Sequence, residues 1–242
     1  MSKSNTLAES NTLADAFEEI CVMDAPLNAR LQAYAAKLRE LNFPFAEAYD
    51  DLVSRLIEGE IGTTAPKVGE VMPSFILPGR DNHLVSLEVL LCSGPLVISF
   101  NRGHWCPFCK IELKTIAAHH QEITAQGGRV ISILPDKQMF AEKLRAETMP
   151  DLIILSDIDN GYSLSLGLAM WLGERLHQLM AGRGHHPKDY IGSDGWFVPL
   201  PATFVVAGDG RVIARHVDPD FRRRMEIDEI LKALREANAR KS

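Results

Sequence analysis

A chain of 242 residues with 46% hydrophobic and 24% charged residues is long enough to bury a full hydrophobic core. Its formal net charge is -6, and its one dense basic run, residues 222–224, is flanked by acidic residues, which argues against a nucleic-acid or membrane partner. The chain has no apolar run of membrane-spanning length and no secretory signal pattern at its N-terminus. We therefore expect a cytoplasmic protein of one domain with an appendage, or of two small domains.

The first quarter of the chain has a helical pattern. Apolar residues recur at alternating steps of four and three from Leu27 to Leu41, and the pattern resumes after Pro44. This spacing places the apolar side chains on one face of a helix. We predict an N-terminal helical extension, residues 1–62, that acts as a lid or packing arm, followed by a second domain, residues 63–242.

Strand and helix patterns alternate from residue 67 onward. The segment "PSFILPGRDNHLVSLEVLL" predicts a hairpin and a short helix. Further strands are predicted at residues 96–100, 130–134 and 152–156, with helices at residues 106–126, 136–149 and 162–170.

A less regular segment, residues 171–200, precedes a second predicted hairpin. In "TFVVAGDGRVIARHV" an Asp-Gly turn at residues 209–210 joins two strands, and a last helix follows with Ile227, Ile230 and Leu234 on one face. The nearly continuous apolar strands indicate a central sheet covered by helices on both sides, and the late hairpin makes that sheet mixed. The fold class is therefore α/β.

Two cysteines, Cys106 and Cys109, lie between a predicted strand and a predicted helix. A structural zinc site usually needs four ligands, and no second such pair is present. On a continuous helix His120 would lie about 16 Å along the axis from Cys109, too far to share one ion. The chain also has no flavin or nucleotide motif. We expect no metal and no cofactor, which leaves a redox couple or two inert thiols.

The residues around the pair favour the redox couple. A helix start stabilises a thiolate through unpaired backbone N–H groups, and Arg102, His104 and Lys110 add positive or titratable groups nearby. Proline is tolerated in the first turn of a helix, so Pro107 can stiffen the loop. Two intervening residues let one thiol resolve an oxidised partner without a large movement.

The pair also lies within a motif that resembles a known active site. The run Trp105 to Cys109, "WCPFC", is similar to the WCxxC motif of thioredoxin-fold proteins. The segment "PLPATFVV" resembles the thioredoxin segment in which a cis-proline faces the dithiol, and Pro201 is the matching position. This resemblance implies a thioredoxin-like fold with a cis peptide bond before Pro201.

A longer stretch, residues 67–234, resembles the peroxiredoxin-like proteins of the alkyl hydroperoxide reductase and thiol-specific antioxidant (AhpC/TSA) superfamily. The segments that carry the resemblance are "KVGEVMPSFILP", "GPLVISFNRGHWCPFCKIEL", "LPATFVV" and "HVDPDFRRRMEIDEIL". The resemblance implies a redox-active disulfide, a hydroperoxide or disulfide substrate, and a dithiol donor such as thioredoxin or glutathione. It also allows a homodimer.

The sequence departs from the superfamily pattern at the peroxide-binding positions. Peroxiredoxins typically carry P-x-x-x-T/S-x-x-C and a late arginine. In an alignment through C-x-x-E, Cys109 and Glu112 match the peroxidatic cysteine and its acidic follower. Cys106 then takes the threonine position, Arg102 the proline position, and Pro201 the position of the late arginine. We therefore expect peroxide turnover below that of a peroxiredoxin with the full motif.

These departures leave the first nucleophile open. The thioredoxin resemblance indicates Cys106, and the peroxiredoxin resemblance indicates Cys109. We favour Cys106, because the helix start gives a lower thiol pKa and better access, with Cys109 as the resolving thiol. Cys92 is expected to be a buried apolar residue. Three functions remain: hydroperoxide reduction, protein-disulfide reduction, and a redox-sensing or interaction module.

Overall fold

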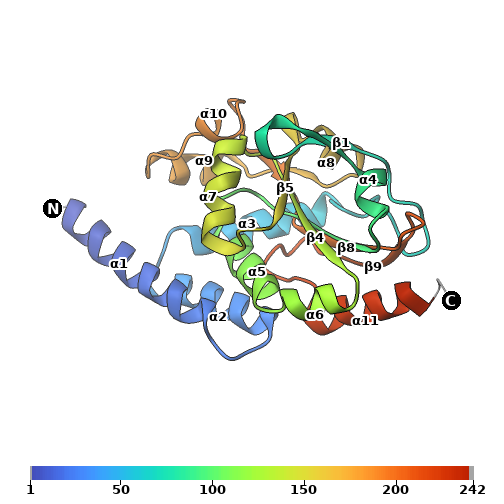
Figure 1. Cartoon of the computed structure of the whole chain (residues 1–242). Coiled ribbons are helices and arrows are strands. Elements are labelled where there is room, and N and C mark those ends of the chain that lie inside the picture. The colour runs from blue at the N-terminus through green and yellow to red at the C-terminus, as the bar shows by residue number, and fades with distance from the viewer. Residues whose placement is uncertain (1, 240–242) are drawn as a thin grey trace.

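A five-stranded sheet with helices on both faces forms the centre of the computed structural model, which describes residues 2–239 (Figure 1). The strands are β3 (Leu96–Phe100), β4 (Arg129–Leu134), β5 (Ile153–Ser156), β8 (Ala202–Val206) and β9 (Val212–Val217), in the order β5-β4-β3-β8-β9. The β3, β4 and β5 strands are parallel, whereas β8 is antiparallel to both β3 and β9. The predicted α/β fold with a mixed sheet is confirmed.

Alternate residues of the strands feed two hydrophobic cores. In β3, Val97 belongs to one core, while Leu96, Ile98 and Phe100 belong to the other. The Val97 face is covered by α5 (Pro107–Ala118), α6 (His120–Ala125), α7 (Gln138–Thr148) and α11 (Ile227–Ala239). Strand side chains alternate between the two faces, so an apolar strand buried on both sides needs this double cover.

The predicted helix over residues 106–126 is divided at His119. The His119 backbone has φ -106° and ψ 13°, and α6 begins at the next residue. The His119 ring Nδ1 lies 2.9 Å from the carbonyl oxygen of Thr115, so the side chain contacts a backbone oxygen near the end of α5. A local contact of this kind offers the backbone an alternative to a continuous helix.

The smaller elements surround the other sheet face. A hairpin of β1 (Ile76–Pro78) and β2 (Leu84–Ser86) leads into α4 (Leu87–Leu91), as expected from the sequence. The segment that looked irregular contains three short elements that periodicity did not reveal. These are α9 (Glu174–Ala181), α10 (Pro187–Tyr190) and β7 (Phe197–Pro199). Strand β7 pairs with β6 (Ala169–Trp171), which begins inside the helix predicted over residues 162–170. Helix α8 (Gly161–Ser165) ends earlier than predicted, before Gly167 at φ 70°.

Three N-terminal helices pack beside α5. They are α1 (Ser2–Cys21), α2 (Leu27–Glu40) and α3 (Phe45–Glu58), and the α2 and α3 side chains join the same hydrophobic core as Phe108 of α5. The helical extension is therefore present and shares its core with the sheet domain. Its separation as a domain at residue 62 stays a prediction. None of the described helices is both long and apolar enough to cross a membrane.

Candidate active site

The two cysteines of the WCPFC motif lie where β3 passes into α5. Cys106 is the N-cap of α5, its sulfur accepts a hydrogen bond from the backbone N–H of Cys109, and Pro107 is the first helical residue. The loop before it turns at Gly103, which has φ 137°. A Cβ atom on Gly103 would lie 2.6 Å from Nε1 of Trp105 and 2.8 Å from Oδ1 of Asp136. Glycine is therefore required for the loop to bring Cys106 to the helix start.

The two sulfurs are in direct contact and are closed off from solvent. Sγ of Cys109 donates to Sγ of Cys106 at 2.8 Å, and both residues are 0% exposed. No disulfide bond joins them, and both cysteines are free. The expectation that Cys106 would be the more exposed sulfur is wrong, because aromatic side chains of α2 and α3 cover the start of α5.

A buried arginine contacts the Cys106 sulfur with two nitrogens. Nε of Arg102 lies 3.3 Å and Nη2 3.1 Å from Sγ of Cys106. The other two expected cationic groups are engaged elsewhere. His104 contacts Asp136 through both its backbone nitrogen and its ring Nδ1, and Lys110 pairs with Glu147. Of the three, Arg102 alone faces the sulfur.

These contacts separate the pKa values of the two thiols. Burial by itself raises the pKa of Cys106, but the hydrogen bonds from Cys109 and the charge of Arg102 outweigh it and lower the pKa to about 5. Burial raises the pKa of Cys109, and its donation to Cys106 raises it further. At neutral pH Cys106 is therefore the thiolate and Cys109 the thiol, which is the arrangement that a nucleophile and a resolving cysteine require.

Three aromatic rings enclose the Arg102 guanidinium. Its carbon lies 4.0 Å from the ring centroid of Phe221, 5.4 Å from that of Tyr49 and 5.5 Å from that of Trp105. Burial alone would lower the pKa of Arg102, but the adjacent thiolate raises it, so the charge persists inside the core. Nη1 is buried and has no hydrogen-bond partner among the described residues. That donor is free to bind an oxygen atom that arrives next to the sulfur.

A second buried ion pair lies behind the cysteines. Nε of Arg224 donates to Oε2 of Glu112 at 3.0 Å, and Thr203 donates to Oε1 at 3.2 Å. Burial raises the pKa of Glu112, while Arg224 opposes that rise. The charge of Arg224 also helps to lower the pKa of Cys106. Glu112, predicted as a supporting residue, therefore holds Arg224 in place near the dithiol.

Sequence reasoning missed Arg224 because it belongs to a basic run with acidic neighbours. Arg222 pairs with Asp220 and Asp50, as a solvated charge cluster would. Arg224 is instead turned into the core, where it is 1% exposed. The spacing of charges along the chain carries no signal for this difference, which depends on tertiary packing.

Pro201 does not have the expected backbone geometry. The described residues contain no cis peptide bond, so the prediction of a cis bond before Pro201 is wrong. The chain runs from β7 into β8 with two residues between them, and Ala202 already pairs with Phe100. An extended connection of this kind contains no tight turn, which is where a cis-proline is typically found. Pro201 is buried and directly precedes β8, beside the end of β3 where the active-site loop begins.

Cys92 is also placed differently from the prediction. It is exposed at the end of α4, whereas Cys21 is buried at the end of α1. The short helix α4 has only five residues, and Leu87 and Leu90 provide its buried face. Cys92 lies just beyond that face, so the apolar character of the side chain was a poor guide to its burial.

A small cavity opens beside the motif. Its volume is about 120 Å³. Trp105 and Pro107, the two neighbours of Cys106 in the chain, belong to its wall, as do aromatic side chains from the N-terminal helices. The remaining lining residues are Tyr34, Leu38, Phe43, Phe45, Tyr49, Met180, Arg183 and His185. The cavity therefore lies next to the motif, although the Cys106 sulfur itself is buried.

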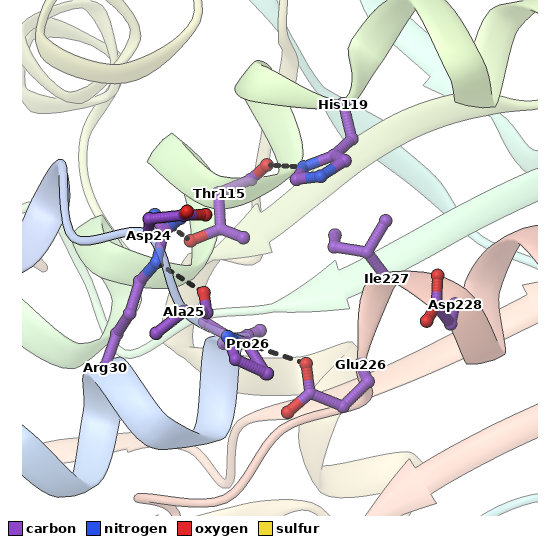
Figure 2. Close-up of a pocket in the computed structure, with 10 residues that line it drawn as sticks. Asp24, Ala25, Pro26, Arg30, Thr115, His119, Glu226, Ile227 and Asp228 are labelled. Atoms are coloured by element: carbon purple, nitrogen blue, oxygen red, sulfur yellow. Dashed lines mark hydrogen bonds between the residues drawn. The ribbon is translucent and has the colours of Figure 1, made fainter.

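A second cavity, of about 550 Å³, lies at the opposite end of α5 (Figure 2). Arg30 points into it but already donates to the carbonyl oxygens of Ala25 and Cys21. The Glu226 carboxylate accepts from the backbone N–H groups at the start of α2, which ties that helix to the segment before α11. The second cavity therefore lies where α2, α5 and α11 meet and is not part of the thiol site.

Mild oxidation is expected to convert Cys106 and Cys109 to one intramolecular disulfide. Their sulfurs already touch, and the helix start can close the bond without refolding. Trypsin cleaves after Arg102 and Lys110, so a single peptide carries both residues, and its mass should fall by two hydrogen atoms. Cys21 and Cys92 should remain free for alkylation after unfolding. A disulfide that includes Cys92 would contradict the assigned pair.

Comparison with known proteins agrees with the observed fold. The model of the AhpC/TSA family matches residues 68–215. Among curated proteins, a thiol:disulfide interchange protein DsbE homolog of Paracoccus denitrificans is 25% identical over 178 residues, covering 72% of this chain and 77% of that protein.

Solved structures of peroxiredoxins share the architecture. Peroxidoxin BcpB from Mycobacterium tuberculosis has a TM-score of 0.54 at 22% identity and covers 71% of this chain and 97% of its own. A Cys-to-Ser mutant of peroxiredoxin 6 of Arenicola marina has a TM-score of 0.56 at 16% identity, over 73% and 75% of the two chains. The reduced 2-Cys peroxiredoxin of Plasmodium vivax has a TM-score of 0.53 at 16% identity, over 72% and 83%.

Proposed function

This chain belongs to the AhpC/TSA family, and from that premise we propose that it is a thiol peroxidase that reduces hydroperoxides through a dithiol–disulfide cycle of Cys106 and Cys109. The observation that carries the proposal is the contact between the Cys106 sulfur and the buried Arg102 guanidinium. That contact provides a thiolate at neutral pH, and the unpartnered Nη1 of Arg102 provides a donor for a peroxide oxygen beside it.

The cycle begins with attack of the Cys106 thiolate on the terminal oxygen of a hydroperoxide, ROOH. An S–O bond forms, the O–O bond breaks, and the departing alkoxide takes up a proton to become ROH. Cys109 then loses its proton and attacks the sulfur of the Cys106 sulfenic acid. A disulfide forms and water leaves. Over both steps the thiol of Cys109 supplies one proton and the solvent supplies the second. A thiol reductant, either a dithiol such as thioredoxin or two molecules of glutathione, would reduce the disulfide and restore the enzyme.

Protein-disulfide reduction is the second candidate function. The similarity to a thiol:disulfide interchange protein favours it, and the same nucleophile and resolving thiol would serve. The trans bond before Pro201 weakens it, because it removes half of the resemblance to thioredoxin. The shared conclusion of both candidates is a thiol-dependent oxidoreductase.

Stopped-flow oxidation of the reduced protein, run beside insulin-disulfide reduction, separates the two functions. We expect hydrogen peroxide and an organic hydroperoxide to oxidise the protein faster than they oxidise free cysteine, with little reduction of insulin. Peroxide rates equal to those of free cysteine, together with rapid insulin reduction, would contradict the peroxidase function and support a disulfide reductase. Inactivity in both assays would favour a redox-sensing module.

A further inference from the structure

Two tyrosines of the N-terminal helices, Tyr34 and Tyr49, pack against Phe108, and Tyr49 also contacts Arg102. Tyr49 lies on α3, outside the residues that match the family model, and it is 6% exposed. Its ring contacts the Arg102 guanidinium and packs edge-on against Phe108, which lies between the two cysteines, at a centroid distance of 5.8 Å. A second edge contact, at 5.3 Å, joins it to Phe221. The position of Tyr49 is therefore fixed from three sides.

Tyr49 also belongs to the wall of the 120 Å³ cavity, together with Trp105 and Pro107. A hydroperoxide that enters this cavity would meet Tyr49 before it reaches the Cys106 sulfur, which is 0% exposed. Because the sulfur is buried and Cys106 is not in the cavity wall, side chains of that wall must shift to admit the substrate. Tyr49 thus both belongs to the cavity wall and contacts the arginine beside the thiolate.

The peroxidase reaction needs a proton donor at this place. An alkoxide is a poor leaving group unless it is protonated as the O–O bond breaks. Cys109 donates its hydrogen to the Cys106 sulfur and is needed for the second step. His104 and Lys110 are engaged with Asp136 and Glu147. Burial raises the pKa of Tyr49 to about 12 against the opposing charge of Arg102, so the phenol is protonated at neutral pH.

We propose that the Tyr49 hydroxyl donates the proton to the leaving oxygen when Cys106 attacks a hydroperoxide. This inference rests on the proposed peroxidase function. The S–O bond forms as the O–O bond breaks, the phenol proton passes to RO⁻ to give ROH, and a proton from water in the cavity restores the phenol. The N-terminal extension then supplies a reacting group to the dithiol as well as covering it.

The test compares two oxidants in the full-length Tyr49→Phe variant, which keeps the ring and removes only the hydroxyl. With tert-butyl hydroperoxide, whose alkoxide must be protonated, the oxidation rate should fall roughly 100-fold. With peracetic acid, whose carboxylate leaves without a proton, the rate should change less than about twofold, on the same reasoning. The rate of Cys106 alkylation by iodoacetamide should also be retained, because iodide needs no proton.

Tyr162→Phe is the matched control, since Tyr162 is a buried tyrosine whose hydroxyl donates to Pro73 away from the dithiol. It should leave both oxidation rates unchanged. An equal fall with both oxidants in Tyr49→Phe would indicate a structural role for Tyr49, and no fall with the hydroperoxide would show that its hydroxyl is not the donor. Either result would overturn the role of Tyr49 and leave the proposed peroxidase function standing. Wild-type protein that reacts with neither oxidant faster than free cysteine would instead overturn the peroxidase function.

Discussion

Replacing Cys106 by serine is expected to abolish oxidation of the protein by hydroperoxides. The thiolate is the reacting species, and the low pKa belongs to Cys106 rather than to Cys109. The rate of the Cys106→Ser variant should fall to background, a loss of at least about 1,000-fold, as when a catalytic nucleophile is removed. Stopped-flow fluorescence can follow the reaction, because Trp105 adjoins the reacting sulfur.

Cys109→Ser is the informative partner of that variant. A serine hydroxyl can still donate a hydrogen bond to the Cys106 thiolate, so the first oxidation should continue at a similar rate. The disulfide cannot close, and intact-protein mass spectrometry should show a product heavier by one oxygen atom, which a sulfenic-acid probe can trap. Full reactivity in Cys106→Ser with none in Cys109→Ser would reverse the assignment of nucleophile and resolving thiol.

Replacing Arg102 by methionine is expected to raise the Cys106 pKa and to slow every reaction of its thiolate at pH 7. In the wild type the thiolate is lost as the pH falls through about 5, so the alkylation rate should fall below that pH and be constant above it. Without the Arg102 charge, only the Cys109 hydrogen bonds and the more distant Arg224 oppose the effect of burial, so the midpoint moves upward. Each unit by which the pKa then exceeds 7 lowers the thiolate fraction about tenfold.

The ultraviolet absorbance of the thiolate, measured against pH, reports this shift independently of substrate access. Arg223→Met serves as the control, because Arg223 belongs to the same basic run as Arg224 but its side chain is 62% exposed. Its titration should match that of the wild type. An unchanged midpoint in Arg102→Met would show that the helix start and the Cys109 hydrogen bonds suffice to hold the thiolate.

The sheet and the active-site loop could be predicted from the sequence because their signals are local. Short apolar runs rich in β-branched residues, such as "LVISF" and "VISIL", favour buried strands, and a strand followed by "WCPFCKIEL" predicts a helix start at the first cysteine. The strands β6 and β7 were missed because they have only three residues each, and their pairing joins segments distant in the sequence.

The environment of the thiolate could be predicted only in part. Arg102 lies four residues before Cys106, so its nearness followed from the sequence. The rings of Tyr49 and Phe221 come from helices and loops more than 50 residues away in either direction, and no periodic pattern predicts that they meet around one guanidinium. The burial of Cys106 has the same origin, since the covering side chains belong to α2 and α3.

The enclosure of Arg102 has a consequence for the protein while the ribosome is still making it. The groups that hold the thiolate come from α3, from the loop before α5, and from Phe221 and Arg224 near the end of the chain. A nascent chain that has emerged only as far as α7 contains Cys106 but lacks the last two of these groups. Its thiol keeps the ordinary reactivity of a cysteine in an unfinished polypeptide. Synthesis of the segment that carries Phe221 and Arg224 therefore completes the aromatic and charged surroundings of the Cys106 sulfur.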